Sequence, residues 1–232
     1  MQNKQQQSSL LSPRLRAAAD LVRGGAFISD VGTDHAYLPI ALALEGKIRG
    51  AVASDINEGP YLCALRNVAA NGLSKKITAK HTAGLCGIES YGPTDILICG
   101  MGGELIASII DEAPWTKNKK IRLIVQPMTH PEILREYLIK NGFTITHETL
   151  VREEKIYQIF AAEYTGEADE YSEAELLLGR QNIKKGGEIF CDLVDRHIEV
   201  NKKILSSKRA GSGDADVSRE EKMISMLEEL KK

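Results

Sequence analysis

A short run at residues 30–39, DVGTDHAYLP, combines a glycine with two carboxylates, an imidazole and a phenol. An apolar segment precedes the run and an apolar, helix-like segment follows it, which predicts a strand end, a tight turn and a helix start. Gly32 allows the backbone to approach a ligand closely because it has no Cβ. Asp34 and His35 stand where a dinucleotide-binding turn, G-x-G-x-x-G, would offer bare N–H groups to a phosphate. The acidic turn therefore favours a cationic cofactor over a pyrophosphate.

A second acid follows at the spacing expected for a nucleotide site. Asp55 ends an apolar run 23 residues after Gly32, close to the interval of ~20 residues at which an acid takes ribose hydroxyls in nucleotide-binding α/β folds. A helix N-cap or an exposed loop carboxylate is the alternative role. Together with the turn at Gly32, Asp55 indicates an S-adenosylmethionine site in which it anchors the ribose.

Three glycines end a third apolar run, residues 95–103, DILICGMGG. Ligands in open parallel sheets lie outside the carboxyl ends of the strands, so this loop is expected beside the turn at Gly32, at the base of the reaction pocket. A plain strand-to-helix turn would explain one glycine, but Gly100, Gly102 and Gly103 together favour close approach to a ligand. The loop lacks the N-P-P-Y or D-P-P-Y tetrapeptide that holds an exocyclic amine, which favours a ring nitrogen as the methyl acceptor.

Other polar groups are open to more than one interpretation. Asp34 suits either contact with the reacting base, including acceptance of its proton, or placement of the cofactor. His35 could also accept a proton, and its alternative is a structural role at a helix start. The remaining histidines have no metal-ligand spacing, so no zinc site is expected. A basic set could form a phosphate-binding face or a solvated surface; it comprises Arg14, Arg16, Arg23, Lys75, Lys76 and Lys80.

The composition is that of a globular protein rather than a membrane or secreted one. The chain has 232 residues, 43% of them hydrophobic, and a formal net charge of -2, so attraction to nucleic acid requires a local basic patch. Its four cysteines are widely spaced and three lie in apolar surroundings, which predicts buried free thiols. No stretch approaches ~18 apolar residues, and the polar residues 1–9 lack the apolar core of a signal peptide. We expect a cytoplasmic protein without a membrane partner.

Alternating apolar runs and amphipathic segments must position these groups. Strands are expected at 26–30, 50–55, 77–81, 95–99 and 121–126, and helices at 36–45, 60–71, after Gly103 and at 131–141. This alternation is typical of βαβ units around a parallel sheet. Runs at 144–152 and 156–163, joined by three charged residues, predict an antiparallel hairpin. A parallel sheet closed by such a hairpin is the α/β, Rossmann-like arrangement of class I methyltransferases, with a seven-stranded sheet.

A helical segment is expected beyond the polar residues 165–170. Apolar residues recur every three to four positions from 176 to 204 and again from 217 to 230, after the flexible link 210–215. Ser218 and Glu221 have the spacing of a capping box. Two or three antiparallel helices are favoured over an intermolecular coiled coil, because too few heptads are sustained. We expect a methyltransferase domain at 1–165 and a C-terminal, coiled-coil-like helical domain at 166–232.

Several runs together resemble the bacterial tRNA (adenine-22-N1)-methyltransferase family. They occur in order over about residues 10–165, and the helical tail matches only in type; the runs are LSPRL at 11–15, DVGTDHAYLP at 30–39, DINEGP at 55–60, GMGG at 100–103, QP at 126–127, LR at 134–135 and EEKIY at 153–157. One departure stands out. Ala83 precedes Gly84-Leu85, where the family usually has an acidic residue that contacts the cofactor adenine.

The resemblance implies an enzyme that transfers a methyl group from S-adenosylmethionine to N1 of an adenine in the D-arm region of tRNA. It implies a target-base site of Asp34, Tyr37, Gly100, Met101 and Gly102. It implies a cofactor site of Asp30, Gly32, Asp34, His35, Asp55, Ile56, Asn57, Ala83, Gly84, Leu85 and Gly100. The C-terminal helices would position tRNA through basic groups such as Lys184, Lys185, Lys202, Lys203, Lys208 and Arg209.

Two competing interpretations remain. A non-catalytic module that binds S-adenosylmethionine or RNA is the main alternative, and Ala83 is the residue that favours it. A nicotinamide-dependent oxidoreductase would need the absent G-x-G-x-x-G turn. The oligomeric state stays open, with a monomer as one alternative.

Overall fold

The protein is described by a computed structural model that covers residues 11–211 and 216–231. The polar residues 1–9 and most of the link at 210–215 lie outside the described residues. The chain divides into two compact units, Met1–Glu170 and Tyr171–Lys232.

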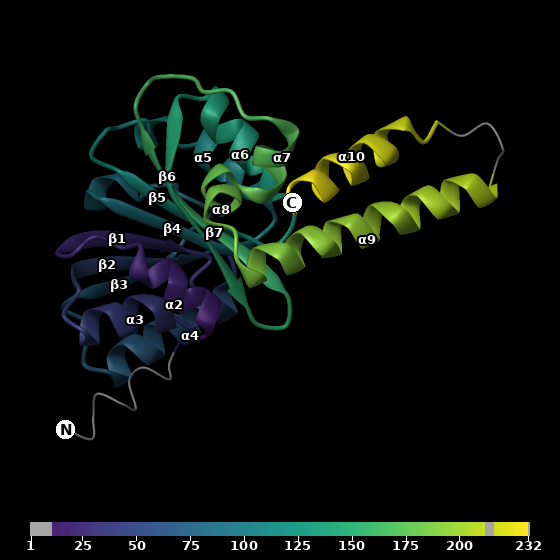
Figure 1. The fold of residues 1–232 in the computed structure, drawn as a ribbon. Helices are drawn as coiled ribbons and strands as arrows, with labels where there is room; N and C mark the ends of the chain where they lie inside the picture. Colours follow the sequence, from purple (N-terminus) through teal and green to yellow (C-terminus); the bar gives the residue numbers. More distant parts are fainter. Residues whose placement is uncertain (1–10, 212–215, 232) are drawn as a thin grey trace. The chain divides into compact units, whose positions relative to one another are not determined.

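A seven-stranded sheet forms the centre of the first unit (Figure 1). The strands follow the order β3-β2-β1-β4-β5-β7-β6, in which β1 to β5 are parallel and β7 is antiparallel to both neighbours. Their bounds are β1 Ala26–Val31, β2 Ile48–Asp55, β3 Ile77–His81, β4 Asp95–Met101, β5 Arg122–Pro127, β6 Phe143–Arg152 and β7 Ile156–Tyr164. The predicted parallel sheet with a closing antiparallel hairpin is confirmed.

Helices cover both faces of this sheet (Figure 1). Helices α2, α3 and α4 lie on one face, and α5 and α6 lie on the other. Their bounds are α2 Pro13–Asp20, α3 Tyr37–Leu44, α4 Glu58–Ala70, α5 Gly103–Asp111 and α6 Pro131–Lys140, with short 3₁₀ turns η1 Glu89–Tyr91 and η2 Pro114–Thr116. The helices expected from the sequence are present with ends shifted by one or two residues. Pro60 is the third residue of α4 rather than its start, and α2 was not predicted.

A buried ion pair ties α6 to the hairpin. The Arg135 and Glu148 side chains are fully buried, and Arg135 Nε donates to Glu148 Oε1 at 2.8 Å. The Arg135 guanidinium also donates to Gln158 Oε1 at 2.8 Å and lies 4.6 Å from the centre of the Phe160 ring. Because removing one member would leave a buried charge without its partner, the pair fixes the register between α6, β6 and β7.

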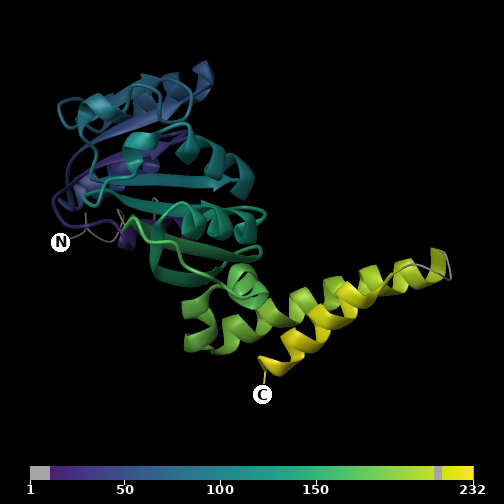
Figure 2. The same cartoon turned by 90° about the horizontal axis from the view of Figure 1, so that it is seen from above.

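The second unit is entirely helical among its described residues. It comprises α7 Glu173–Leu178, α8 Arg180–Lys185, α9 Glu188–Gly211 and α10 Ser218–Glu229. Helices α9 and α10 lie side by side and antiparallel (Figure 2), and ion pairs such as Lys202–Glu228, at 3.0 Å, bridge them. The helical character expected from the sequence is confirmed.

The predicted capping box of Ser218 and Glu221 is wrong. Val217 is the N-cap residue of α10, and the Ser218 hydroxyl donates to Asp216 Oδ1 at 2.7 Å. A capping box occurs instead at the start of α7, where Ser172 and Glu175 exchange hydrogen bonds. The local spacing of serine and glutamate is the same in both places, so the backbone entering the helix decides which pair forms.

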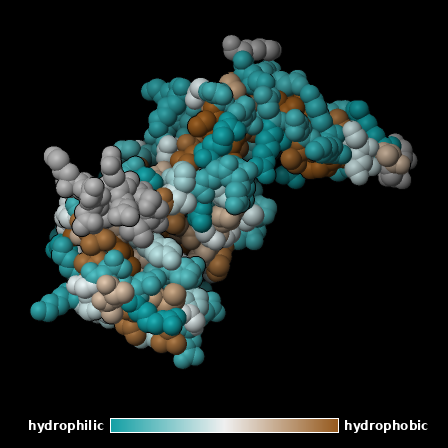
Figure 3. Space-filling view, turned by 90° about the horizontal axis from the view of Figure 1, so that it is seen from below, coloured by the Kyte–Doolittle hydropathy of each residue, from teal (hydrophilic) through white to brown (hydrophobic). Residues whose placement is uncertain are grey.

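The face of the molecule drawn in Figure 3 is mainly hydrophilic, with separate groups of hydrophobic side chains. Two of the exposed large hydrophobic residues are Ile56, which follows β2, and Leu105 on α5. Both lie at the edge where the parallel strands end, which directs attention to that edge.

Candidate functional site

Two adjoining cavities open at the carboxyl ends of the parallel strands. Strand β1 lies between β2 and β4, so the connections from β1 and β4 leave to opposite faces and create the crevice in which α/β sheets bind ligands. The first cavity, of about 270 Å³, is lined by Arg14, Leu15, Asp30, Gly32, Thr33, Asp34, His35, Tyr37, Leu38, Cys99 and Gly100. The second, of about 450 Å³, is lined by Val31, Gly32, Asp55, Ile56, Asn57, Thr82, Ala83, Gly84, Cys99, Gly100, Met101, Leu105, Ser108, Ile109 and Glu112.

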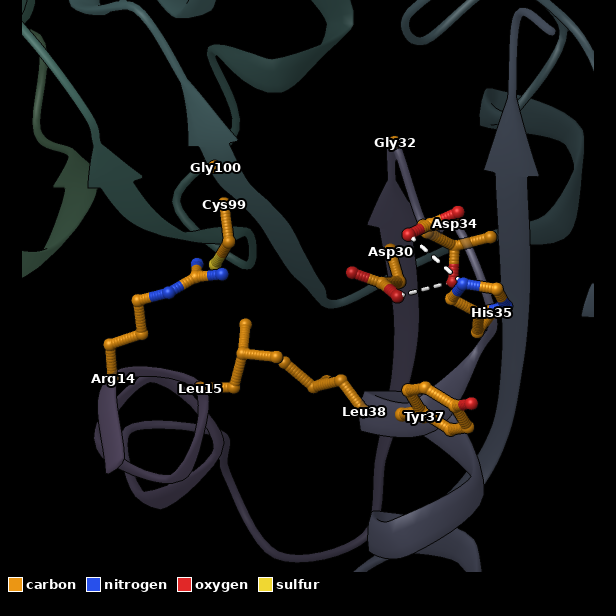
Figure 4. A pocket seen from close by; sticks show the side chains of 11 residues that line it. Arg14, Leu15, Asp30, Gly32, Asp34, His35, Tyr37, Leu38, Cys99 and Gly100 are labelled. Carbon is orange, nitrogen blue, oxygen red and sulfur yellow. Dashed lines mark hydrogen bonds and ion pairs between the residues drawn. The ribbon is translucent and has the colours of Figure 1, made fainter. Parts of the chain in front are cut away.

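A buried carboxylate stands at the inner end of the first cavity (Figure 4). Asp30 is almost completely buried near the end of β1, and Thr33 Oγ1 donates to Asp30 Oδ2 at 2.5 Å. Burial raises the pKa of Asp30 to about 6, since desolvation disfavours the charged form more than the Thr33 hydrogen bond favours it. Burial likewise raises the pKa of the Cys99 thiol above its ordinary value.

The turn after β1 presents a second, exposed carboxylate. Asp34 has a φ of 52° and Ala36 a φ of 58°, left-handed values that are uncommon outside glycine. The Asp34 side chain is 65% exposed, with Oδ2 3.3 Å from His35 Nε2. His35 Nδ1 lies 2.9 Å from Cys63 Sγ, and the His35 and Tyr37 rings stack with centroids 5.1 Å apart. The turn therefore holds an acid and two rings at the mouth of the first cavity.

Arg14, on α2, forms the opposite wall (Figure 4). Arg14 Nη1 donates to Gln126 Oε1 at 2.9 Å, and its backbone N–H donates to Glu153 Oε1 at 2.5 Å. The guanidinium also lies 5.6 Å from the centre of the Tyr157 ring. Gln126 Oε1 in addition accepts the Gly100 N–H at 3.2 Å, so one side chain links the cation to the glycine loop.

The sequence did not assign Arg14, Gln126, Glu153 or Tyr157 a role within the pocket. All four nevertheless lie in runs on which the family resemblance rests. For Arg14, the sequence predicts only membership in a phosphate-binding face or a solvated surface. Their place in those runs is therefore the feature of the sequence that could have indicated a role for them in the pocket.

The second cavity has an acid at one side and apolar walls. Asp55 Oδ1 accepts the Asn57 N–H at 2.9 Å, and Asp55 Oδ2 lies at the limit of hydrogen-bond distance, 3.4 Å, from the Asp34 N–H. Ile56 and Leu105 line the cavity with side chains that are 64% and 53% exposed. Exposed aliphatic side chains on a cavity wall suit a flat ring that covers them.

The glycines at this edge serve different purposes. Gly32 has a φ of 70°, and a Cβ there would lie 2.3 Å from Met101 Cε. Gly100 has a φ of 81° and lies within the end of β4, where the pairing with β5 shifts register between Cys99 and Met101. A Cβ on Gly103 would lie 2.2 Å from the His130 carbonyl oxygen, so this third glycine permits packing of two loops rather than approach to a ligand.

Most of the predicted site residues line one of the two cavities. The first cavity receives Asp30, Asp34, His35 and Tyr37, and the second receives Asp55, Ile56, Asn57, Ala83, Gly84 and Met101. Gly32 and Gly100 border both. Leu85 is buried with 4% exposure, and neither Leu85 nor Gly102 lines a cavity.

The four cysteines are free, but the prediction that they are buried is wrong, since Cys86 is exposed and Cys63, Cys99 and Cys191 are half-buried. Within residues 11–211 and 216–231, no group of three or more histidine, cysteine, aspartate or glutamate side chains is arranged to hold a metal ion. None of the helices in the same ranges is both long enough and apolar enough to span a membrane.

Comparison with known proteins identifies the family. Residues 28–230 match the TrmK model, tRNA (adenine(22)-N(1))-methyltransferase. A Bacillus subtilis protein of that description is 39% identical over 154 residues, which are 66% of this chain and 65% of the relative. The match thus spans just under two thirds of the relative's length.

Solved structures agree over nearly the whole chain. A Streptococcus pneumoniae protein in complex with S-adenosyl-L-methionine is 33% identical, with a TM-score of 0.85 over 95% of this chain and 99% of that one. The Bacillus subtilis TrmK is 32% identical, with a TM-score of 0.82 over 95% and 97% of the two chains. Because the family model matches residues 28–230, this chain belongs to the tRNA (adenine(22)-N(1))-methyltransferase family.

Proposed function

We propose that the protein methylates N1 of adenine 22 in tRNA, with S-adenosylmethionine as the methyl donor. One observation carries the proposal. A cavity large enough for a nucleoside and a smaller cavity lined by acids share a wall at Gly32, Cys99 and Gly100. A donor in one cavity and an acceptor base in the other would meet at that wall. The proposal includes a cytoplasmic location, where tRNA is modified.

The second cavity fits the nucleoside portion of the cofactor. Asp55 has carboxylate oxygens for ribose hydroxyls, and Ile56 and Leu105 offer aliphatic surface to a purine. Asn57, Ala83 and Gly84 complete this wall, and Leu85 supports it from within the core. Gly32 leaves room beside Met101 for the connection between the cofactor's two halves, because any Cβ there would meet the methionine methyl group.

The first cavity fits the amino-acid portion and the target base. Asp30 and Gly32 border the inner part, and Asp34, His35 and Tyr37 stand at the mouth, with Gly100 on the same lining. Met101 lines the second cavity, and Gly102 lines neither of the two. When bound, S-adenosylmethionine supplies an electrophilic methyl group. N1 of neutral adenine already has a lone pair, so the protein's main contribution is to place that nitrogen correctly.

Asp34 would interact with the positive charge of the methylated base. Methylation at N1 leaves a positive charge on the ring, and an exposed carboxylate at the cavity mouth stabilises that charge or accepts the proton of the exocyclic amine. N1 is hidden in a Watson–Crick pair, so the base must be unstacked to reach the cavity. The Tyr37 ring, which is 42% exposed, offers a surface on which the extruded base can stack.

The helical unit would position the tRNA. Its basic groups are partly engaged within the unit, since Lys202, Lys208 and Arg209 form ion pairs across α9 and α10. The field available to phosphates is therefore weaker than a count of lysines suggests. Lys184 and Lys203 are exposed and are the groups we assign to phosphate contact.

Nucleoside analysis tests the proposed activity. Unmodified tRNA is incubated with the protein and S-adenosylmethionine, digested, and analysed by mass spectrometry for 1-methyladenosine. A tRNA with guanine in place of adenine 22 is the control and should give none. If the protein binds S-adenosylmethionine by calorimetry but methylates no tRNA, the non-catalytic module is correct instead.

A further inference from the structure

The lining of the second cavity includes a carboxylate, that of Glu112, which belongs to none of the motifs found in the sequence. Besides Asp55, the cavity is lined by Glu112, the C-cap residue that follows α5. Ser108 Oγ, one helical turn earlier and also on the lining, donates to Glu112 Oε1 at 3.3 Å. The serine thus restrains an otherwise exposed carboxylate.

The position of Glu112 follows from how α5 packs. A Cβ built on Gly84 would lie 3.3 Å from Ile109 Cγ2, so α5 rests against the loop after β3 at this point. Glu112 lies three residues after Ile109, which places both on the same helix face. The cavity therefore extends from Asp55, past Ala83 and Gly84, to the carboxylate at the end of α5.

The chemistry of this end of the cavity selects a donor. At neutral pH an ionised carboxylate only accepts hydrogen bonds. The neighbouring Ala83 side chain has no polar atom, so Glu112 is the only acid at this end of the lining. If Asp55 held the ribose and Ile56 lay under the ring, the outer edge of the purine would meet the rest of the lining, which includes Ala83, Gly84 and Glu112.

Resting on the proposed function, we infer that Glu112, restrained by Ser108, accepts a hydrogen bond from the exocyclic amine of the cofactor's adenine. Hypoxanthine has a carbonyl oxygen in place of that amine, and this oxygen would face the Glu112 carboxylate with no hydrogen to share between the two acceptors. Glu112 thereby makes the cofactor site selective for adenine over hypoxanthine, and it does so in place of the acid that Ala83 lacks.

Calorimetry with two product analogues tests this assignment. S-adenosylhomocysteine carries the amine, and S-inosylhomocysteine carries an oxygen in its place. The wild-type protein should prefer the adenosine compound by at least about tenfold, the effect of one hydrogen bond to a charged group. Glu112→Gln can both donate and accept, so its preference should fall to about twofold.

Two further variants complete the test. Asp111→Asn removes an equal charge from the neighbouring residue, whose carboxylate accepts the Tyr137 hydroxyl and does not line the cavity; its preference should match the wild type. Ala83→Asp combined with Glu112→Gln returns an acid to the same end of the cavity. This double variant should recover the preference for S-adenosylhomocysteine.

Two results would overturn the inference. One is an unchanged preference in Glu112→Gln, and the other is an equal loss of affinity for both compounds, which would show a packing effect instead of recognition of the amine. Neither readout depends on methyl transfer. A protein that discriminates the two compounds through Glu112 but methylates no tRNA would refute the proposed activity and leave this inference intact.

Discussion

The two cavities share a wall but differ in how their lining is built. Acids and basic or aromatic groups dominate the first cavity, where Asp30 is buried and Arg14 is held by Gln126 and Glu153. Aliphatic side chains dominate the second, with Asp55 and Glu112 on different elements of its lining. We infer a division of work in which the second cavity recognises a nucleoside through aliphatic surface and two separate acids, and the first cavity places charged groups beside the reacting atoms.

Loss of the exposed acid of the first cavity should have the largest effect. Asp34→Asn keeps the shape of the side chain but removes the charge that we propose faces the methylated base, so kcat should fall about 100-fold. The dissociation constant for S-adenosylhomocysteine should stay within about threefold. Single-turnover methylation and calorimetry give the two values. Equal losses in both would place Asp34 on the cofactor and break the proposed division.

A methyl group added at Gly32, in the wall shared by the two cavities, should weaken cofactor binding more than any other substitution in that wall or in the second cavity. Gly32→Ala forces Met101 toward the cavity and strains a backbone with a φ of 70°, so affinity for S-adenosylhomocysteine should fall about 100-fold. Gly46→Ala is the matched control, because Gly46 has a φ of 71° with no atom within 4 Å of the new Cβ. A similar loss in the control would assign the effect to backbone strain alone.

The acid of the second cavity should contribute less. Asp55→Ala removes the acceptor for the ribose hydroxyls, and we expect S-adenosylhomocysteine affinity to fall about 30-fold, or about 2 kcal/mol. Its affinity for homocysteine, which lacks the ribose, should not change. Calorimetry of both compounds measures the difference. Unchanged affinity for S-adenosylhomocysteine would remove Asp55 from the cofactor site.

The buried acid of the first cavity should reduce stability near neutral pH. The pKa of Asp30 is raised to about 6 from 3.8, so the folded protein holds the proton more tightly than the unfolded chain. Stability from this group is therefore full below about pH 4, falls as the pH rises to about 6, and stays low above that. The shift corresponds to about 3 kcal/mol as an order of magnitude.

Asp30→Asn should therefore stabilise the cofactor-free protein. We expect a gain of about 1 kcal/mol at pH 7.5, less than the full shift because a buried amide is also desolvated. The gain should disappear at pH 4. Denaturant unfolding at both pH values measures it, and a variant that is less stable at pH 7.5 would show that the Asp30 carboxylate is favourable in the fold.

Substitutions in the helical unit should have the smallest effect and should spare both cavities. Lys184→Ala with Lys203→Ala should weaken tRNA binding about threefold and lower the dependence of log K on log salt by about one to two, since each phosphate contact contributes about one. Affinity for S-adenosylhomocysteine should not change. Filter binding at several salt concentrations measures the slope, and an unaltered slope would exclude these lysines from phosphate contact.

Local patterns in the sequence were enough to predict the strands and the groups at their ends. The apolar runs before Gly32, Asp55 and Gly100 became β1, β2 and β4, because burial on both faces requires unbroken apolar residues. The expected hairpin formed for the same local reason. Helix α2 was missed, although Pro13 stands at its first turn, because the helix has only eight residues and Leu15 is its one large apolar side chain.

Contacts between distant residues could not be predicted in the same way. Arg14 meets Gln126 across 112 positions and Glu153 across 139, and no local spacing relates them. No motif in the sequence marks Glu112, and it borders the second cavity because α5 packs at Gly84. The role of Gly103 also changed, since its missing Cβ makes room for His130 and not for a ligand.

The sequence by itself determined the order of the elements, the acidic glycine turn at residues 30–35 and the second acid at Asp55. The hydrophobic periodicity, the positions of glycines and the types of residues at strand ends depend on a few neighbouring positions, so they can be recognised in the sequence. Only the tertiary structure decided that these groups border two cavities, that Arg14 closes one and that Glu112 borders the other. Packing of α2 and α5 on opposite faces of the sheet brings those side chains to the same edge, and packing depends on surfaces that no short stretch of sequence contains.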